Sequence, residues 1–218
     1  MADTLSFLPA LPVILAFSLA GLVLFLTPGP DMSLWLARTL ARGRGAGIAA
    51  AMGTSAGCLV HVSLAALGIS VLIQASPLAF NAMKLVGAAY LSWLAVQALR
   101  HGTALQVQDS AGPGPRGLLG DAMAGFVVNL SNPKVVVFFI TFLPGFVSAT
   151  DPHAAAKLWF LGLYFVAMTA ILSVFLILSA ERFIAALRAR PRLLRGIDYA
   201  FAGVFAAFAM SILRTQAR

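Results

Sequence analysis

Residues 21–38 have the sequence GLVLFLTPGPDMSLWLAR, in which an apolar stretch is interrupted by Pro28, Gly29 and Pro30 and then resumes. Proline has no N–H group and its ring clashes with the preceding helical turn, so these residues must break a helix. We therefore expect one long apolar segment that is split into two helices, with Asp31 directly after the break.

A second stretch repeats this pattern in the other half of the chain. Residues 125–144 have the sequence GFVVNLSNPKVVVFFITFLP, and the break at Asn132 and Pro133 is followed at once by Lys134. An offset of 104 residues aligns the two breaks. The sequence therefore predicts a chain of two related halves, each with a broken helix.

The composition indicates a membrane protein. Of the 218 residues, 61% are apolar and only 10% are charged, and the mean hydropathy is +0.94. A soluble domain averages about 45–50% apolar and about 25% charged residues, and one core of this size could not bury so much apolar surface. These values exclude a soluble enzyme, a secreted disulfide scaffold and a disordered regulator.

The spacing of the apolar runs predicts six transmembrane helices. A span needs about 20 apolar residues, and runs of that kind lie at about 8–28, 45–73, 82–99, 120–148, 157–180 and 197–213. We expect an all-α integral membrane protein with one transporter domain. The domain consists of a first three-helix repeat at about 8–99, a linker at about 100–119 and a second three-helix repeat at about 120–213. Because each repeat has an odd number of spans, the second must enter the membrane upside down, so the repeats are inverted. No basic segment precedes the first run, so we expect a permanent span rather than a signal peptide.

Basic residues alternate between the gaps that separate the runs. The net charge is +8, but the Lys and Arg residues lie beside apolar runs, which is typical of membrane orientation rather than of nucleic-acid binding. The first, third and fifth gaps hold ten basic residues, against one in the second and fourth. The positive-inside rule then places the odd gaps in the cytoplasm and both termini outside. The Arg-rich fifth gap, 181–196, is either an amphipathic segment on the inner membrane surface or a solvated basic loop.

Breaks at matching positions of two inverted halves predict the substrate site of a transporter. Unwound backbone at mid-membrane is tolerated only where it is buried in protein or lines a cavity, and helix ends at a break offer free N–H groups to an anion. The alternative is that the prolines kink the helices for packing alone. We expect the substrate to contact the residues at and beside the two breaks, namely Pro28, Gly29, Pro30, Asp31, Asn129, Asn132, Pro133 and Lys134.

Asp31 and Lys134 indicate the chemistry of the substrate. A charged group deep in a span costs about 3 kcal/mol or more, so it usually faces a cavity or a partner. We hypothesise that Asp31 contacts a substrate ammonium or carries a coupling proton, and that Lys134, with Asn129 and Asn132, contacts a carboxylate. An amino acid or a similar small zwitterion presents both charges. The alternative is that Asp31 and Lys134 pair with each other and join the halves.

The second span contains Gly53 and Gly57, with His61 four residues further on. Small residues on one helix face let another helix approach closely, so we interpret both glycines as packing positions, and glycine-rich faces also allow a homodimer. His61 is either a proton relay or a histidine hydrogen-bonded within the bundle. We interpret Cys58 as a small core residue and Lys84, near the end of the third span, as a side chain that extends to the membrane surface.

The sequence lacks the patterns of several other functions. No His, Cys, Asp and Glu residues cluster with metal-ligand spacing, no Ser/His/Asp set, HExxH motif or paired carboxylate indicates an enzyme, and no P-loop indicates ATP hydrolysis. We therefore expect no cofactor, no metal and no enzymatic activity. The alternatives to an amino-acid transporter are an exporter of a cation or another small metabolite and a membrane assembly protein.

Four blocks of sequence, in this order, resemble the LysE/RhtB family of bacterial amino-acid exporters. They are residues 27–31 (TPGPD), the pair Gly53 and Gly57, residues 84–91 (KLVGAAYL), and residues 125–134 (GFVVNLSNPK), which run on to FLPGFV at 142–147. The resemblance implies a multi-pass inner-membrane exporter of amino acids or related metabolites, driven by the proton gradient through alternating access. Family members often have Gln where this chain has Gly145. The shared blocks do not define which substrate is carried.

Overall fold

The computed structural model describes residues 8–76, 117–148 and 151–216, with single residues between 78 and 100. Over these ranges the chain forms helices and no strand. The elements are, in chain order, α1 (Leu11–Leu26), α2 (Pro30–Arg42), α3 (Arg44–Ala75), α5 (Leu118–Leu130), α6 (Pro133–Val137), the π-helix η3 (Phe138–Phe142), the 3-10 helix η4 (Leu143–Phe146), α7 (Ala154–Leu178), α8 (Ala180–Ala189) and α9 (Pro191–Gln216). Part of the expected third span, including Lys84, and most of the expected linker lie outside the described residues.

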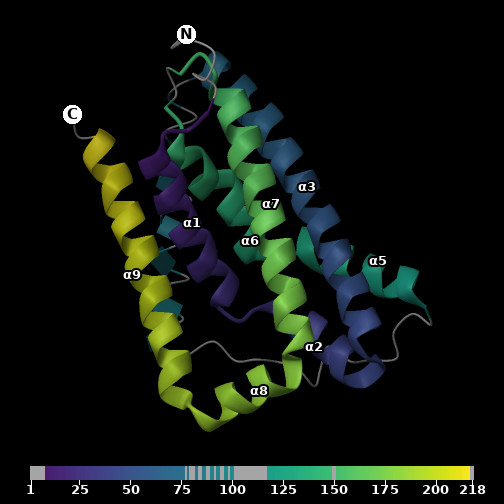
Figure 1. Ribbon diagram of the computed structural model, residues 1–218. Coiled ribbons are helices and arrows are strands. Elements are labelled where there is room, and N and C mark those ends of the chain that lie inside the picture. Colours follow the sequence, from purple (N-terminus) through teal and green to yellow (C-terminus); the bar gives the residue numbers. More distant parts are fainter. Residues whose placement is uncertain are drawn as a thin grey trace.

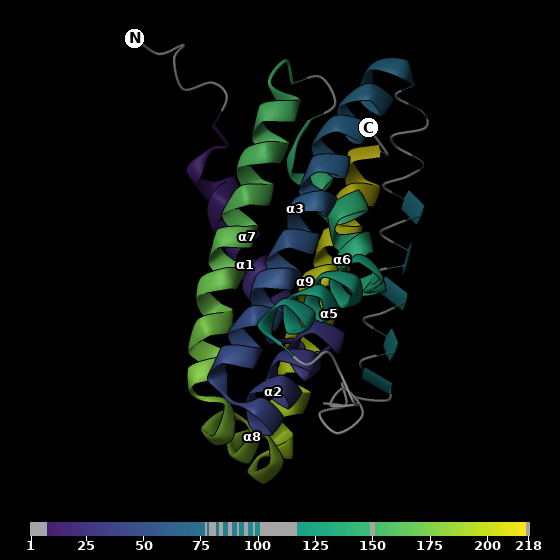
Figure 2. The same cartoon turned by 90° about the vertical axis from the view of Figure 1, so that its right-hand side faces the viewer.

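The long helices lie alongside one another. α1, α3, α7 and α9 share one general direction, and α2 and α8 lie together at one end of the molecule (Figures 1 and 2). The first residues of α1 and the last residues of α9 lie at the opposite end, and α5 lies obliquely across α3 (Figure 1). α2, which follows α1, and α8, which follows α7, are therefore neighbours.

The first broken segment has the expected form. α1 and α2 meet at a bend of 54°, and Pro30 is the first residue of α2, where a missing N–H is harmless. α2 ends at Gly43, whose φ of +86° lies in the region that favours glycine. α3 begins at the next residue.

The second broken segment differs from our expectation of one helix after the break. The bend between α5 and the following helices is 55°, but beyond α6 the chain changes to a π-helix and then to a 3-10 helix. The N–H of Leu143 bonds the carbonyl of Phe138, one residue further back than in an α-helix. Pro144 then has no N–H with which to continue the ladder.

Two glycines bring the backbones of α3 and α5 together. A Cβ atom at Gly53 would overlap the carbonyl of Ala122, and a Cβ atom at Gly125 would overlap the carbonyl of Ala50. Without side chains at these positions the helices approach more closely than larger residues allow. Gly57, one turn further along α3, leaves room for the side chain of Asn129 in the same way.

A cluster of ionised side chains around the buried Asp121 joins α2 to the first turn of α5. The Asp121 side chain is fully buried, and Nη1 of Arg42 donates to its two oxygens at 2.6 and 2.8 Å. The Nε atom of Arg38, which is also buried, lies 3.5 Å from the nearer oxygen. The cluster fixes the position of α5 relative to the end of α2.

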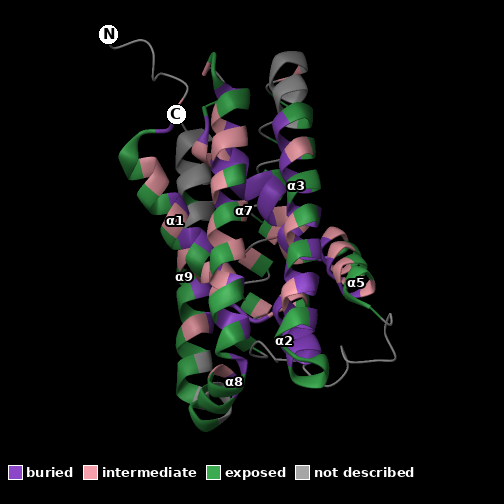
Figure 3. Cartoon of the chain, turned by 45° about the vertical axis from the view of Figure 1, so that its right-hand side comes forward, coloured by how far each residue is buried: buried purple, intermediate pink, exposed green. Residues whose placement is uncertain are grey.

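The outer faces of the helices are apolar. Leu11, Leu15 and Leu19 follow one face of α1 and are 59–67% exposed, and Figure 3 shows exposed residues facing outward along α1 and α7 while α2 is largely buried. Lipid is the environment in which such faces are stable. Among the described residues, α3 and α7 are each long and apolar enough to cross a membrane, and the number of candidate spans there rises to four if each bent pair is counted as one. The arrangement of six helices in two inverted repeats stays a prediction.

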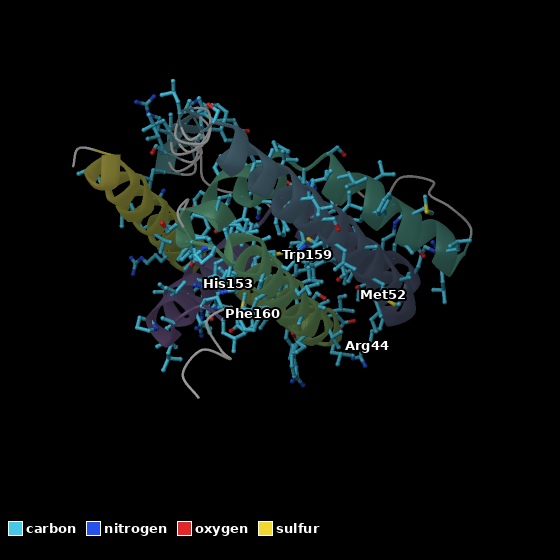
Figure 4. All side chains as sticks on the ribbon, turned by 90° about the horizontal axis from the view of Figure 1, so that it is seen from above. Arg44, Met52, His153, Trp159 and Phe160 are labelled. Atoms are coloured by element: carbon cyan, nitrogen blue, oxygen red, sulfur yellow. The ribbon has the colours of Figure 1, made fainter. Side chains whose placement is uncertain are left out.

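The interior is filled by aromatic side chains. Phe17, Phe138, Phe139 and Phe142 are each exposed by 1% or less. Trp159 of α7 packs against this core, and Figure 4, seen from above, shows where it lies among the helices. This core lies between the helix breaks and the end at which α1 begins.

The Arg-rich fifth gap contains a helix rather than a loop. α8 covers residues 180–189, with Ile184 buried and Arg182 exposed. The interpretation as a solvated loop is therefore wrong, because an apolar face on this segment packs against the bundle and holds it in a helix.

Candidate functional site

The first break leaves carbonyl groups without their helical partners at the end of α1. The carbonyl of Leu24 would accept a hydrogen bond from residue 28 in a continuous helix, but Pro28 has no N–H. The ammonium of Lys134 takes this place, since its Nζ donates to the carbonyls of Leu24 at 3.2 Å and Thr27 at 2.8 Å. A Cβ atom on Gly29 would lie 3.1 Å from this Nζ, so glycine leaves room for the lysine.

At the second break, a side chain of α3 contacts the carbonyl of Asn129. Pro133 offers no N–H to the carbonyl of Asn129, and Nε2 of His61 lies 3.4 Å from that oxygen. The imidazole ring also stacks on Phe139, with ring centroids 5.7 Å apart. These contacts are those of a histidine that is hydrogen-bonded within the bundle.

The start of α6 sets the direction of Lys134. The side-chain oxygen of Asn132 accepts a hydrogen bond from the N–H of Lys134 at 3.1 Å, and Pro133 is the first helical residue. Both are favoured residues at these positions of a helix. The Nδ2 atom of Asn132 is buried and has no hydrogen-bond partner.

Asp31 lies in the first turn of α2, where a negative charge is favoured by the helix dipole. Nδ2 of Asn129 donates to one carboxylate oxygen, Oδ2, at 3.0 Å. The other oxygen, Oδ1, is buried and has no hydrogen-bond partner. Since most buried polar atoms in proteins are hydrogen-bonded, this oxygen is a place where a donor from outside the chain can bind.

Each charge at the breaks is therefore held by the opposite half of the chain. Asp31 accepts from Asn129, and Lys134 donates to the end of α1. Within the described part of the chain, no ion pair shorter than 4 Å joins Asp31 to Lys134. The halves are joined at their breaks by these hydrogen bonds and not by a direct pair between the two charges.

A cavity lies between the breaks, and both charged residues line it. Its volume is about 50 Å³, enough for a few water molecules at about 10–15 Å³ each. Pockets that hold drug-sized ligands measure about 300–1,000 Å³, so the walls must separate before an amino acid can enter. The other residues of the lining are Leu24, Phe25, Met32, Trp35, Thr54, Cys58, Val135, Phe165 and Thr169.

The structure brings together the polar residues that the sequence singled out. Asp31 and Lys134 line the cavity, and Asn129 and Asn132 contact them. Cys58, which we interpreted as a core residue, is buried and also lines the cavity.

The sequence did not identify the apolar wall of the cavity. Phe165 belongs to α7, which is apolar on all sides, so its sequence pattern carries no signal for the face that lines a site. Trp35 lies on the apolar face of the amphipathic α2, and that pattern does not distinguish a site from core packing. The acceptors of Lys134 were missed for a different reason, because they are backbone carbonyls whose availability depends on where the partner helix ends.

No three His, Cys, Asp or Glu residues come together in a way that could hold a metal ion in the part of the chain that the structure describes. The chemistry of the site there comes from one carboxylate, one ammonium, two amides and helix ends.

A helical bundle with lipid-exposed faces, in which two broken helices meet at a charged cavity, defines the class of multi-pass membrane transporters. Within this class, the chain belongs to the LysE type translocator family, whose model matches residues 22–216. It is a bacterial inner-membrane protein.

Several curated proteins are similar to the chain over most of its length. An uncharacterized membrane protein of Pseudomonas aeruginosa is 33% identical over 90% of this chain and 92% of its own length. The homoserine/homoserine lactone efflux protein of Salmonella typhimurium is 30% identical over 87% and 90% of the two chains. The leucine efflux protein of Klebsiella pneumoniae is 28% identical over 93% and 95%. No solved structure matches the chain.

Proposed function

We propose that the protein exports amino acids or related small zwitterionic metabolites across the bacterial inner membrane. The observation that carries this proposal is that Asp31 and Lys134 line one cavity at the point where the two helix breaks meet. Membership of the LysE type translocator family and similarity to named efflux proteins support it.

The two ends of a zwitterion have separate places in this proposal. The substrate ammonium binds Oδ1 of Asp31, which is buried without a partner. The substrate carboxylate binds the ammonium of Lys134 and the unpartnered Nδ2 of Asn132. We assign Asn129 to the ammonium end of the substrate and not to its carboxylate end, because the Nδ2 of Asn129 donates to Asp31 and orients it.

Transport in this proposal follows alternating access and is driven by protons. Asp31 can hold a proton or a substrate ammonium at its free oxygen, but not both, so protonation from outside releases the substrate. The cavity is too small for an amino acid, so its walls must separate in the inward-open and outward-open forms. His61, the other residue considered for proton coupling, is engaged with the carbonyl of Asn129, so we assign the coupling to Asp31.

The first experiment measures efflux from bacteria that express the protein and have been loaded with amino acids through dipeptides. We expect Lys134→Ala and Asp31→Asn to lower the export rate at least about tenfold, because a hydrogen bond to a charged group contributes about 1.5–3 kcal/mol. Lys157→Ala and Asp151→Asn are matched controls, since these residues pair with each other away from the breaks. The site assignment is wrong if both site variants, at equal abundance, export at the rate of the wild type.

A second experiment tests the coupling. We expect the wild-type export rate to rise as the external pH is lowered at constant internal pH, because more protons then reach Asp31. Asp31→Asn has no carboxylate to titrate and should lose this dependence, whereas Asp151→Asn should keep it. Export that is unchanged when the proton gradient is collapsed would contradict proton coupling while leaving the export function intact.

A further inference from the structure

The wall of the cavity that lies beyond the two charges determines which side chain an amino-acid substrate can carry. We infer from this wall that the protein prefers amino acids with uncharged, apolar side chains over those with hydroxylated or charged ones. The inference rests on the proposed function, since it concerns the same cavity.

The wall is formed by apolar side chains from several helices. Phe25 of α1, Trp35 of α2, Val135 of α6 and Phe165 of α7 all line it. Phe25 and Trp35 stack with their ring centroids 6.0 Å apart, and Val135 and Phe165 are buried. A substrate that places its charged groups at Asp31 and Lys134 therefore directs its side chain against hydrocarbon and aromatic surface.

The polar atoms of α2 and α3 in the wall are already engaged with each other. Nε1 of Trp35 donates to Oγ1 of Thr54 at 2.9 Å, and this hydroxyl donates in turn to the carbonyl of Ala50 at 3.1 Å. An indole has one N–H and a threonine hydroxyl has one proton. Neither group has a donor left for a substrate.

The hydroxyl on α7 is engaged in the same way. Oγ1 of Thr169 donates to the carbonyl of Phe165 at 2.9 Å, within its own helix. Of the remaining lining residues that the structure describes, Cys58 contributes only a thiol, which is a weak donor. The wall therefore offers its shape and apolar surface, and no strong donor, to a substrate side chain.

This arrangement ranks the substrates. Each methylene group that moves from water to the wall favours binding roughly fourfold, whereas a substrate hydroxyl loses its bonds to water and finds no free donor in the wall, which disfavours binding by about tenfold or more. A side-chain charge is excluded more strongly still. We expect leucine, isoleucine, valine and methionine to be carried, homoserine and threonine to be carried poorly, and lysine and glutamate not to be carried.

The test uses the purified full-length protein in proteoliposomes, with labelled leucine, homoserine, lysine and glutamate at equal concentrations. We expect leucine to be transported at least about tenfold faster than homoserine. Val135→Thr keeps the shape of the side chain and adds a hydroxyl to the wall, so it should lower the leucine-to-homoserine ratio by about tenfold. Val137→Thr, on the same helix but outside the cavity lining, should leave this ratio unchanged.

A second variant tests the wall without relying on Val135. Trp35→Phe keeps an aromatic ring and removes the N–H, which frees one lone pair of the Thr54 hydroxyl. The leucine-to-homoserine ratio should fall in this variant too. Thermal unfolding of the wild-type protein in detergent gives a measurement that needs no variant, since leucine should raise Tm more than homoserine at equal concentration.

Two outcomes overturn the inference, and they differ in what they leave standing. If homoserine or lysine is transported faster than leucine, the role of the wall is wrong while the protein remains an amino-acid exporter. If correctly inserted protein transports no amino acid of the panel and none raises its Tm, the proposed function fails and the inference fails with it.

Discussion

Lys134 and His61 each supply a hydrogen-bond donor at a place where a proline has removed one. Pro28 leaves the carbonyl of Leu24 for Lys134, and Pro133 leaves the carbonyl of Asn129 for His61. An unpaired carbonyl in a membrane interior costs several kcal/mol, so the first break depends on Lys134. At the second break His61 adds to a backbone hydrogen bond, since the N–H of Asn132 also donates to the carbonyl of Asn129, at 3.1 Å. The same lysine also lines the cavity, so in the proposed function the stability of the first break is linked to the binding of a substrate.

A pair of substitutions at His61 separates a structural role from a proton relay. We expect His61→Leu to lower the free energy of unfolding by about 0.5–1.5 kcal/mol, because it removes one hydrogen bond to the carbonyl of Asn129, which keeps the N–H of Asn132. His61→Gln retains an N–H group and should recover much of the stability and the export activity. Thermal unfolding and efflux are measured side by side. A glutamine variant that is as stable as the wild type but has lost its response to external pH would instead indicate a relay.

Among the elements, α3 holds the two broken segments in place. Its glycines let α5 lie against it backbone to backbone, and its His61 reaches the end of α5 at the break. α5 is held a second time by the ion cluster of Arg38, Arg42 and Asp121 on α2. The second break is therefore positioned by two neighbouring helices that belong to the other half of the chain.

Removal of the charge on Asp121 tests how much this second attachment contributes. We expect Asp121→Asn to lower the free energy of unfolding by about 3–5 kcal/mol, because it leaves buried arginine charge without its partner. Thermal unfolding in detergent measures this change.

Asp151→Asn is the control for that measurement. Lys157 donates to the Asp151 carboxylate near the start of α7 and holds its pKa below the usual value. Such a pair near the surface contributes about 1 kcal/mol or less. If the two variants lose the same small amount of stability, the buried cluster does not hold α5 as we describe.

For the whole molecule, the distribution of charge gives an orientation. Arg44 and Arg182 lie at the end formed by α2 and α8, and α1 begins at the opposite end (Figure 1). The positive-inside rule places the α2 and α8 end in the cytoplasm. In the proposed function, export then carries a substrate from that end, past the cavity, toward the end with the aromatic core.

Cysteine labelling tests this orientation. The chain has a single cysteine, Cys58, which is buried. We expect Arg44→Cys to react with a membrane-impermeant maleimide only after the cells are permeabilised, because it faces the cytoplasm. Asp151→Cys, near the start of α7, should react in intact cells. The reverse labelling pattern would show the opposite orientation in the membrane and would contradict the orientation that the basic residues predict.

The amino-acid sequence was sufficient for the class of protein and for the location of its breaks, because both depend on local properties. A chain this apolar needs lipid around it however its helices pack against one another, and a proline lacks an N–H in any surroundings. For the same reason Asp31 and Lys134 could be predicted to face a cavity or a partner, since a charge directly after a break in an apolar span is costly otherwise.

Only the tertiary structure decided what these residues contact. Lys134 bonds a carbonyl that lies 110 residues away in the sequence, and nothing local specifies that pairing. The same holds for Asn129, which orients Asp31 rather than joining Lys134, and for the apolar wall, whose residues come from separate helices. Helical periodicity limits which residues share a face, but the packing of helices against one another selects the face that becomes a site, because the energy of that choice comes from contacts between distant parts of the chain.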